Sequence, residues 1–145
     1  MSPSPSATVP HAAAIEVEWL AGLEFQAGRP QGPRIRIDGD ATSAPSPFDA
    51  LLAAIATCAS TDVVTILQKQ RTPVKALRVM IEAQRVASTP RRLASAILHF
   101  TITAPGSTQV KADRAVELSI TKYCSVRSSL IADAAVSWTV QLLPA

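Results

Sequence analysis

Residues 46–70 read SPFDALLAAIATCASTDVVTILQKQ, and this stretch decides the fold because it predicts one long helix. Ser46 is suited to cap the helix, Pro47 to occupy its first position, and Asp49 stands three residues after the cap, as in a capping box. Apolar side chains occupy nearly every side of this helix, which is typical of a helix at the centre of a fold. These side chains are Leu51, Leu52, Ala54, Ile55, Ala59, Val63, Ile66 and Leu67.

Segments on both sides of the helix alternate apolar and polar residues, as half-buried strands do. Before the helix, residues 15–19, 23–27 and 34–38 predict three short strands in an antiparallel meander. After it, residues 76–86 and 94–104 predict two longer strands that form a second hairpin.

The C-terminal part returns to helical periodicity before a last strand. Residues 107–123 predict a helix, residues 125–132 a short helix and residues 135–143 a strand. The resulting order of strands and helices predicts an α+β protein without internal repeats. We expect one domain over residues 15–145, preceded by a disordered Pro/Ser-rich tail at residues 1–14.

The composition is that of a globular protein with a large apolar core, since 48% of the 145 residues are hydrophobic and 17% are charged. The net charge of +3 is scattered along the chain and aromatic residues are few, so a nucleic-acid partner is not expected. The N-terminus lacks a secretory signal, and no run approaches the roughly 18 to 20 apolar residues of a membrane span. We therefore expect a cytoplasmic protein with no membrane partner.

The chain has two cysteines, Cys58 and Cys124, and a reducing cytosol disfavours a structural disulfide between them. Cys58 lies among small apolar residues of the predicted long helix, and its position alone favours an inert, buried thiol. Cys124 precedes the predicted short helix, whose unpaired backbone N–H groups and dipole would lower the pKa of its thiol. Burial, metal binding and redox chemistry are the three possible roles of these thiols.

A metal site is not expected, because the sequence contains no Cys-x-x-Cys or His-x-x-x-His spacing. His11 falls in the predicted tail, and His99 falls on a predicted strand, where a hydrogen-bonded structural histidine is favoured. The sequence also lacks a Gly-rich phosphate loop and a Gly-x-Ser-x-Gly motif. We expect no bound metal or cofactor.

Three segments resemble the OsmC/Ohr family of small thiol-dependent proteins. They are APSPFDALLAAIATCASTDVVTILQKQR, TPRRLASAILHFTIT and RAVELSITKYCSV, and the similarity runs from about Val17 to Leu142. The sequence is most similar to a less characterised branch, which has Ser-Pro-x-Asp/Glu before the first cysteine and Lys-Tyr-Cys-Ser-Val around the second.

The resemblance implies an intertwined homodimer, in which antiparallel sheets wrap around two long central helices and each active site lies at the subunit interface. It also implies the reduction of organic hydroperoxides, an antioxidant activity of the stress response. Cys58 would be the peroxidatic thiol that becomes a sulfenic acid, and Cys124 the resolving thiol that forms a disulfide with it. An external dithiol would reduce this disulfide, so the activity would need no cofactor.

The family also implies an arginine that is held by a carboxylate and keeps the peroxidatic thiol ionised. Residues 34–39, RIRIDG, resemble the family pattern Arg-aromatic-acid-Gly, which makes Arg36 the candidate and Arg34 its rival. Phe48 stands where the peroxidases carry Glu, so Asp49 is the candidate carboxylate. On an ideal helix, however, Asp49 points away from Cys58, which leaves open a role in capping alone.

A function without turnover is the alternative prediction. A dimeric binding or redox-sensing protein would hold a small apolar ligand at the subunit interface, in a pocket walled by Phe48, Leu51, Ile55 and Val126. The phenylalanine in place of the family carboxylate and the apolar character of the long helix motivate this hypothesis.

Overall fold

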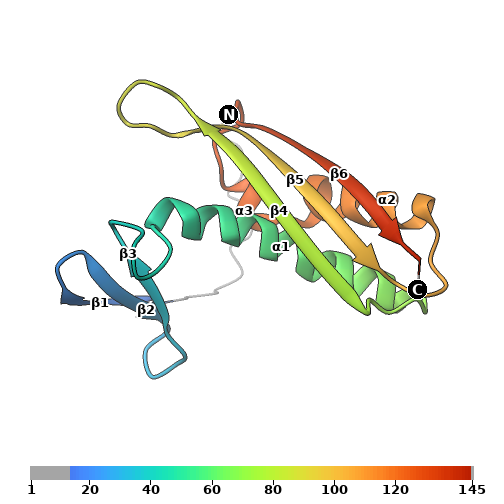
Figure 1. Ribbon diagram of the computed structural model, residues 1–145, viewed down its shortest axis with the longest axis horizontal. Coiled ribbons are helices and arrows are strands. Elements are labelled where there is room, and N and C mark those ends of the chain that lie inside the picture. The colour runs from blue at the N-terminus through green and yellow to red at the C-terminus, as the bar shows by residue number, and fades with distance from the viewer. Residues whose placement is uncertain (1–13, 145) are drawn as a thin grey trace, which may run out of the picture. The chain divides into compact units, whose positions relative to one another are not determined.

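The computed structural model describes residues 14–144, and their secondary structure follows the predicted α+β order (Figure 1). The elements are β1 (Glu16–Ala21), β2 (Glu24–Gly28), β3 (Ile35–Asp38), α1 (Pro47–Lys69), β4 (Ala76–Arg85), β5 (Leu93–Thr103), α2 (Gln109–Leu118), the π-helical turn η1 (Ser119–Tyr123), α3 (Ser125–Ser128) and β6 (Ala135–Leu143).

The chain divides into two compact units, with the division between Ala50 and Leu51. The predicted extent of a single domain over residues 15–145 stays a prediction. The predicted tail, apart from Ala14, and His11 lie outside the described residues.

The N-terminal unit contains the predicted meander, in which β1 pairs with β2 and β2 with β3, all antiparallel. Phe25 lies at its centre, opposite Trp19 on one side and Ile37 on the other. Gly22 in the first turn has a φ of 53°, a left-handed conformation that glycine adopts without a steric penalty.

Asp38 at the end of β3 organises the loop that leads to α1. The backbone N–H groups of Ser43 and Asp40 donate to its buried carboxylate at 3.0 and 2.9 Å, and the Thr42 hydroxyl donates at 2.9 Å. These donors, Ser43 first among them, hold the pKa of the Asp38 carboxyl far below its usual range. The loop therefore depends on the ionised form of Asp38.

Replacing Asp38 with asparagine will lower the free energy of unfolding at neutral pH. The variant should also lose less of this free energy than the wild type when the pH is lowered. A depressed carboxyl pKa stabilises the fold fully above the pKa of the unfolded chain, about 3.9, and this stabilisation is lost progressively as the pH falls from there toward the lower pKa of the folded state. Urea unfolding at pH 7 and pH 3, followed by circular dichroism, should show a lower midpoint for Asp38→Asn at pH 7 and a smaller difference between the midpoints at pH 3. The exposed neighbour Asp40 supplies the control, Asp40→Asn. A constant gap between wild type and Asp38→Asn at both pH values would contradict the prediction.

Helix α1 begins with a reciprocal capping box. The Asp49 backbone N–H donates to Ser46 Oγ at 3.1 Å, and the Ser46 backbone N–H donates to Asp49 Oδ2 at 3.0 Å. The expected helix start is therefore confirmed, and Asp49 acts there as a capping residue.

The burial of α1 differs from the expectation that a helix apolar on all sides is surrounded by the fold. Its buried residues fall at intervals of about one turn along one face, whereas Val64 is 39% exposed. The buried residues are Ile55, Ala56, Ala59, Val63 and Leu67. A single chain thus covers one face of this helix and leaves other apolar positions open.

The expectation that no segment reaches the composition of a membrane span was wrong for α1. This helix is long enough, and with a mean hydropathy of 1.9 over its best 18-residue window also apolar enough, to cross a membrane. The core helix of a soluble protein satisfies the same two criteria, so they are weak evidence for a membrane span.

The C-terminal unit contains the second sheet, in the order β4-β5-β6. Strands β4 and β5 form the predicted antiparallel hairpin. The expectation of antiparallel sheets was wrong for the last pair, because α2, η1 and α3 form a crossover after which β6 runs parallel to β5. Helix α2 packs along β6 (Figure 1). The core residues of β5 are almost completely inaccessible to solvent: Leu98, Phe100 and Ile102.

Candidate functional site

The C-terminal unit brings Cys58 and Cys124 together. Cys58 lies on α1, Cys124 lies between η1 and α3, and the two thiols are close enough to shift each other's pKa. Both cysteines are free; Cys58 is half-buried and Cys124 is only 3% exposed. The Cys124 Sγ also lies 4.0 Å from the carbonyl oxygen of Ile55, almost one turn before Cys58 on α1.

A π-helical turn places Cys124 against α1. Sequence periodicity predicted one helix over residues 107–123, but α2 ends at Leu118 and the wider turn η1 follows it. The buried Ser119 hydroxyl stabilises this transition by donating to the Ala115 carbonyl at 2.7 Å. Cys124 then adopts an extended conformation and caps α3. Single π-helical turns of this kind are frequent at functional sites.

The surroundings of Cys58 favour its thiolate. Burial by itself would raise the pKa of the Cys58 thiol. Hydrogen-bond donors at residues 124–126 outweigh burial and lower the pKa below its usual value. The backbone N–H of Val126 contributes most, followed by the Cys124 thiol and the Ser125 side chain and backbone. The Ser125 hydroxyl lies 3.9 Å from the Cys58 Sγ.

Cys124 has the opposite shift, which corrects the expectation that the following helix would lower its pKa. Burial raises the pKa of the Cys124 thiol, and the backbone N–H of Arg127, which donates to its Sγ at 3.3 Å, only partly offsets this. Proximity to Cys58 raises the pKa further. The expectation was wrong because burial of the Cys124 thiol outweighs the backbone N–H groups of Arg127 and Val126, which by themselves lower its pKa.

The predicted supporting residues Arg36, Arg34 and Asp49 all belong to the N-terminal unit. Arg36 Nη2 lies 3.8 Å from Glu24 Oε2, and its side chain is 56% exposed. Arg34 Nη2 lies 3.1 Å from Glu16 Oε1. The predicted roles of these three residues at the thiol pair stay predictions.

Sequence analysis missed the contribution of Ser125 and Val126 to this site. The signal for it was the serine directly after Cys124, which starts the short helix and whose backbone N–H is therefore unpaired within it. Arg127, two positions after Ser125, is half-buried, and its Nη2 donates to the carbonyl of Ala134 at 2.9 Å.

Within residues 14–144, no group of three or more His, Cys, Asp and Glu residues could hold a metal ion. His99 has the structural role expected from its strand position. Its Nδ1 lies 2.8 Å from the Thr139 hydroxyl and its Nε2 lies 3.4 Å from Glu82 Oε2, so the three side chains form a row across β4, β5 and β6.

Of the four residues expected to wall the alternative apolar pocket, one is fully buried and three are half-buried. Ile55 is 1% exposed, and Leu51 and Val126 are half-buried. Phe48 is half-buried in the N-terminal unit. The apolar ligand at a subunit interface stays a prediction.

Comparison with known proteins matches residues 38–140 to the family described as OsmC-like protein. The chain belongs to the OsmC-like family. This OsmC-like protein is similar to Protein YhfA of Escherichia coli (strain K12). The two are 39% identical over 111 residues, which cover 76% of this chain and 83% of YhfA. The resemblance found in the sequence is thereby confirmed.

Solved structures share the fold of this OsmC-like protein. The crystal structure of an OsmC-like protein from Mycoplasma pneumoniae has a TM-score of 0.78 at 16% identity, covering 92% of this chain and 99% of that one. The organic hydroperoxide resistance protein OhrB of Bacillus subtilis has a TM-score of 0.59 at 10% identity, covering 90% and 98%. At these identities the likeness concerns the fold, and the predicted α+β, OsmC-like fold class is confirmed.

Proposed function

We propose that this OsmC-like protein is a thiol peroxidase that reduces organic hydroperoxides, with Cys58 as the peroxidatic and Cys124 as the resolving cysteine. The observation that carries the proposal is a pair of free thiols beside the same turn, with Cys58 Sγ 3.9 Å from the Ser125 hydroxyl and Cys124 Sγ 3.3 Å from the Arg127 N–H. Their pKa values are shifted in opposite directions, down for Cys58 and up for Cys124. The thiolate is the nucleophilic form of cysteine, so this asymmetry assigns the two roles.

In the first step, the Cys58 thiolate attacks the terminal oxygen of the hydroperoxide. The O–O bond breaks, the sulfur is oxidised to a sulfenic acid, and the alkoxide takes up a proton and leaves as an alcohol. Hydrogen bonds from Val126 and Ser125 stabilise the thiolate before the attack. Arg36 is proposed as a cation that stabilises the same charge.

In the second step, the sulfur of Cys124 attacks the sulfur of the sulfenic acid and forms a disulfide. The hydroxyl group leaves as water and takes the proton of the Cys124 thiol, which its raised pKa keeps in place until then. A dithiol of the cell then reduces the disulfide in two exchange reactions and restores both thiols. No bound cofactor takes part in this cycle.

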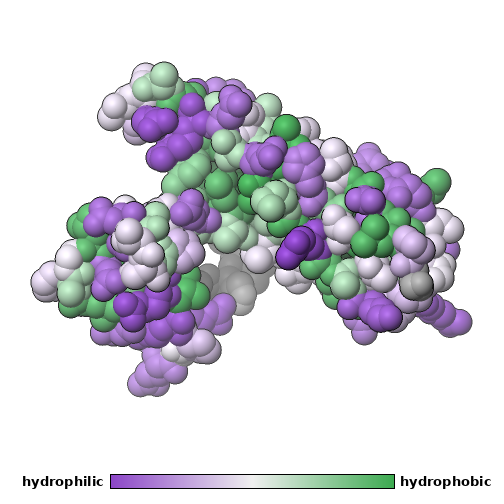
Figure 2. Space-filling model, viewed as in Figure 1, coloured by the Kyte–Doolittle hydropathy of each residue, from purple (hydrophilic) through white to green (hydrophobic). Residues whose placement is uncertain are grey.

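A second copy of the chain is the proposed partner, and the cytoplasm the proposed location. The N-terminal unit supports a homodimer because apolar side chains of its strands are open to solvent, among them Val17, Trp19 and Ile35. Figure 2 shows hydrophobic residues, in green, at the surface of this unit beside hydrophilic ones. Exposed apolar groups that lie together are typical of an interaction surface.

Treatment of the fully reduced protein with one equivalent of cumene hydroperoxide will test the proposal. Intact mass spectrometry should show the loss of two hydrogen atoms per chain, peptide mapping should show a Cys58–Cys124 disulfide, and one equivalent of cumyl alcohol should form. A sample without hydroperoxide, kept free of oxygen, is the control. Two free thiols after treatment, or a disulfide that forms without alcohol, would refute the proposed activity.

A further inference from the structure

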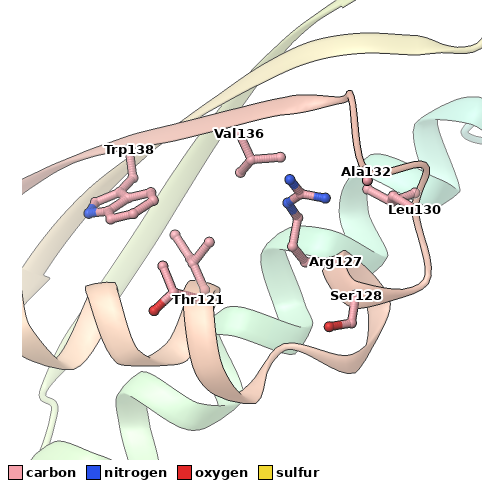
Figure 3. A pocket seen from close by; sticks show the side chains of 8 residues that line it. Thr121, Arg127, Ser128, Leu130, Ala132, Val136 and Trp138 are labelled. Carbon is pink, nitrogen blue, oxygen red and sulfur yellow. The ribbon is translucent and has the colours of Figure 1, made fainter. Parts of the chain in front are cut away.

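The C-terminal unit contains a cavity of about 420 Å³ that includes neither cysteine. It lies between η1, α3 and the loop after α3 on one side and β6 on the other (Figure 3). Its volume is within the range of small-molecule sites, about 300 to 1,000 Å³. The lining residues are Ile120, Thr121, Arg127, Ser128, Leu130, Ala132, Val136 and Trp138.

Arg127 supplies the one charged side chain among these lining residues. Its guanidinium extends from α3 toward β6, beside Val136 (Figure 3). One of its nitrogens donates to the carbonyl of Ala134, and in residues 14–144 no carboxylate lies within ion-pair distance of it. Asp133, the acidic residue nearest in the sequence, instead pairs with Arg92 at 3.1 Å. The cavity therefore has a half-buried positive charge that no side chain of the described chain neutralises.

Polar and apolar groups contribute about equally to the cavity surface, and Thr121 and Ser128 lie among the lining residues. The apolar part comes from four large side chains: Ile120, Leu130, Val136 and Trp138. A fitting ligand consequently has one negatively charged end and an apolar body. A guanidinium matches the planar carboxylate group with two parallel hydrogen bonds, and one cation balances one negative charge. A phosphate group, with a charge of about −1.5 to −2, would leave charge unbalanced.

We infer that this cavity is a binding site for a small monocarboxylate with an aliphatic chain, whose carboxylate pairs with Arg127 and whose chain lies against Val136 and Trp138. The site is separate from the thiol pair, although Arg127 touches both, since its backbone N–H donates to the Cys124 Sγ. Because a saturated carboxylate cannot be oxidised by or reduce a thiol, its binding is testable whether or not the protein is a peroxidase.

Calorimetric titration of the unchanged, reduced protein compares octanoate with octanol, octylamine and inorganic phosphate. Octanoate should bind saturably, and each of the other compounds should bind at least about tenfold more weakly. Only octanoate has both a carboxylate that pairs with Arg127 and an alkyl chain that packs against the apolar side chains. Affinity should rise by about fourfold for each CH₂ group added from butanoate to octanoate. Equal affinity for octanol and octanoate, or no saturable binding of octanoate, would overturn the inference.

Two variants locate the site. Arg127→Gln should weaken octanoate binding by at least about tenfold and leave octanol binding unchanged, whereas Arg78→Gln, at an exposed position on β4, should change neither. In a Trp19→Phe background, Trp138 is the one remaining tryptophan, and its fluorescence should respond to octanoate. Trp138 fluorescence that does not change on addition of octanoate would show that octanoate binds elsewhere and would overturn the inference. Should Arg127→Gln fail to fold, the ligand comparison in the unchanged protein still decides.

Discussion

Replacing Cys58 with serine will lower the rate of organic hydroperoxide reduction on the order of a hundredfold or more. The serine hydroxyl stays protonated near neutral pH, whereas a cysteine with a lowered pKa supplies the nucleophilic thiolate. The thiolate of Cys58 is the species that the hydrogen bonds from Val126 and Ser125 favour. The rate is measured as the loss of cumene hydroperoxide with an excess of a dithiol. Thr57→Ala, at the exposed neighbouring position of α1, should stay close to the wild-type rate.

The variant Cys124→Ser separates the two steps of this cycle. It should release one equivalent of alcohol per chain. Turnover should then stop, because a reductant that acts only on the disulfide has no substrate, and Cys58 should remain a sulfenic acid that dimedone traps. Turnover by Cys58→Ser, together with inactivity of Cys124→Ser in the first step, would reverse the roles assigned from the pKa shifts.

Replacing Phe100 with alanine will lower the free energy of unfolding by about 3 to 5 kcal/mol, the usual cost of removing a buried aromatic ring. Phe100 is 1% exposed at the centre of β5, where the ring lies in the core of the C-terminal unit. The cavity left behind cannot be filled by the neighbouring Leu98 and Ile102, because their positions are set by the same strand. Urea unfolding followed by circular dichroism measures the change.

Met80→Ala is the matched control for this prediction. Met80 lies on β4, is 59% exposed and loses little burial when shortened, so the change in stability should stay within about 0.5 kcal/mol. Similar losses from Phe100→Ala and Met80→Ala would show that the sheet face occupied by Phe100 is not the core.

Opposite pKa shifts of two neighbouring thiols have a simple structural origin. Cys124 is the more deeply buried of the two, and burial is the largest cause of its raised pKa. The backbone N–H groups of Val126 and Ser125 help to lower the pKa of Cys58, whereas those of Arg127 and Val126 only partly offset the burial of Cys124. The arrangement keeps one thiol ready to ionise and the other protonated, although both lie in the same unit of one small protein.

Much of the fold could be predicted from the sequence because its signals act between close neighbours in the chain. The capping box of Ser46 and Asp49 joins residues three positions apart, and the alternation along β4 and β5 depends on successive side chains pointing to opposite faces. The order of segments and the residues around Cys58 and Cys124 also sufficed to recognise the OsmC-like family.

The tertiary structure alone decided which thiol is favoured as a thiolate, that β6 runs parallel to β5, that one face of α1 stays open, and that Arg127 extends into a cavity. Each of these depends on groups far apart in the chain, such as the Val126 amide and the Cys58 sulfur. Burial and hydrogen bonding between such groups depend on their distance in space, which the backbone path sets, whereas helix capping and strand alternation need only the local sequence.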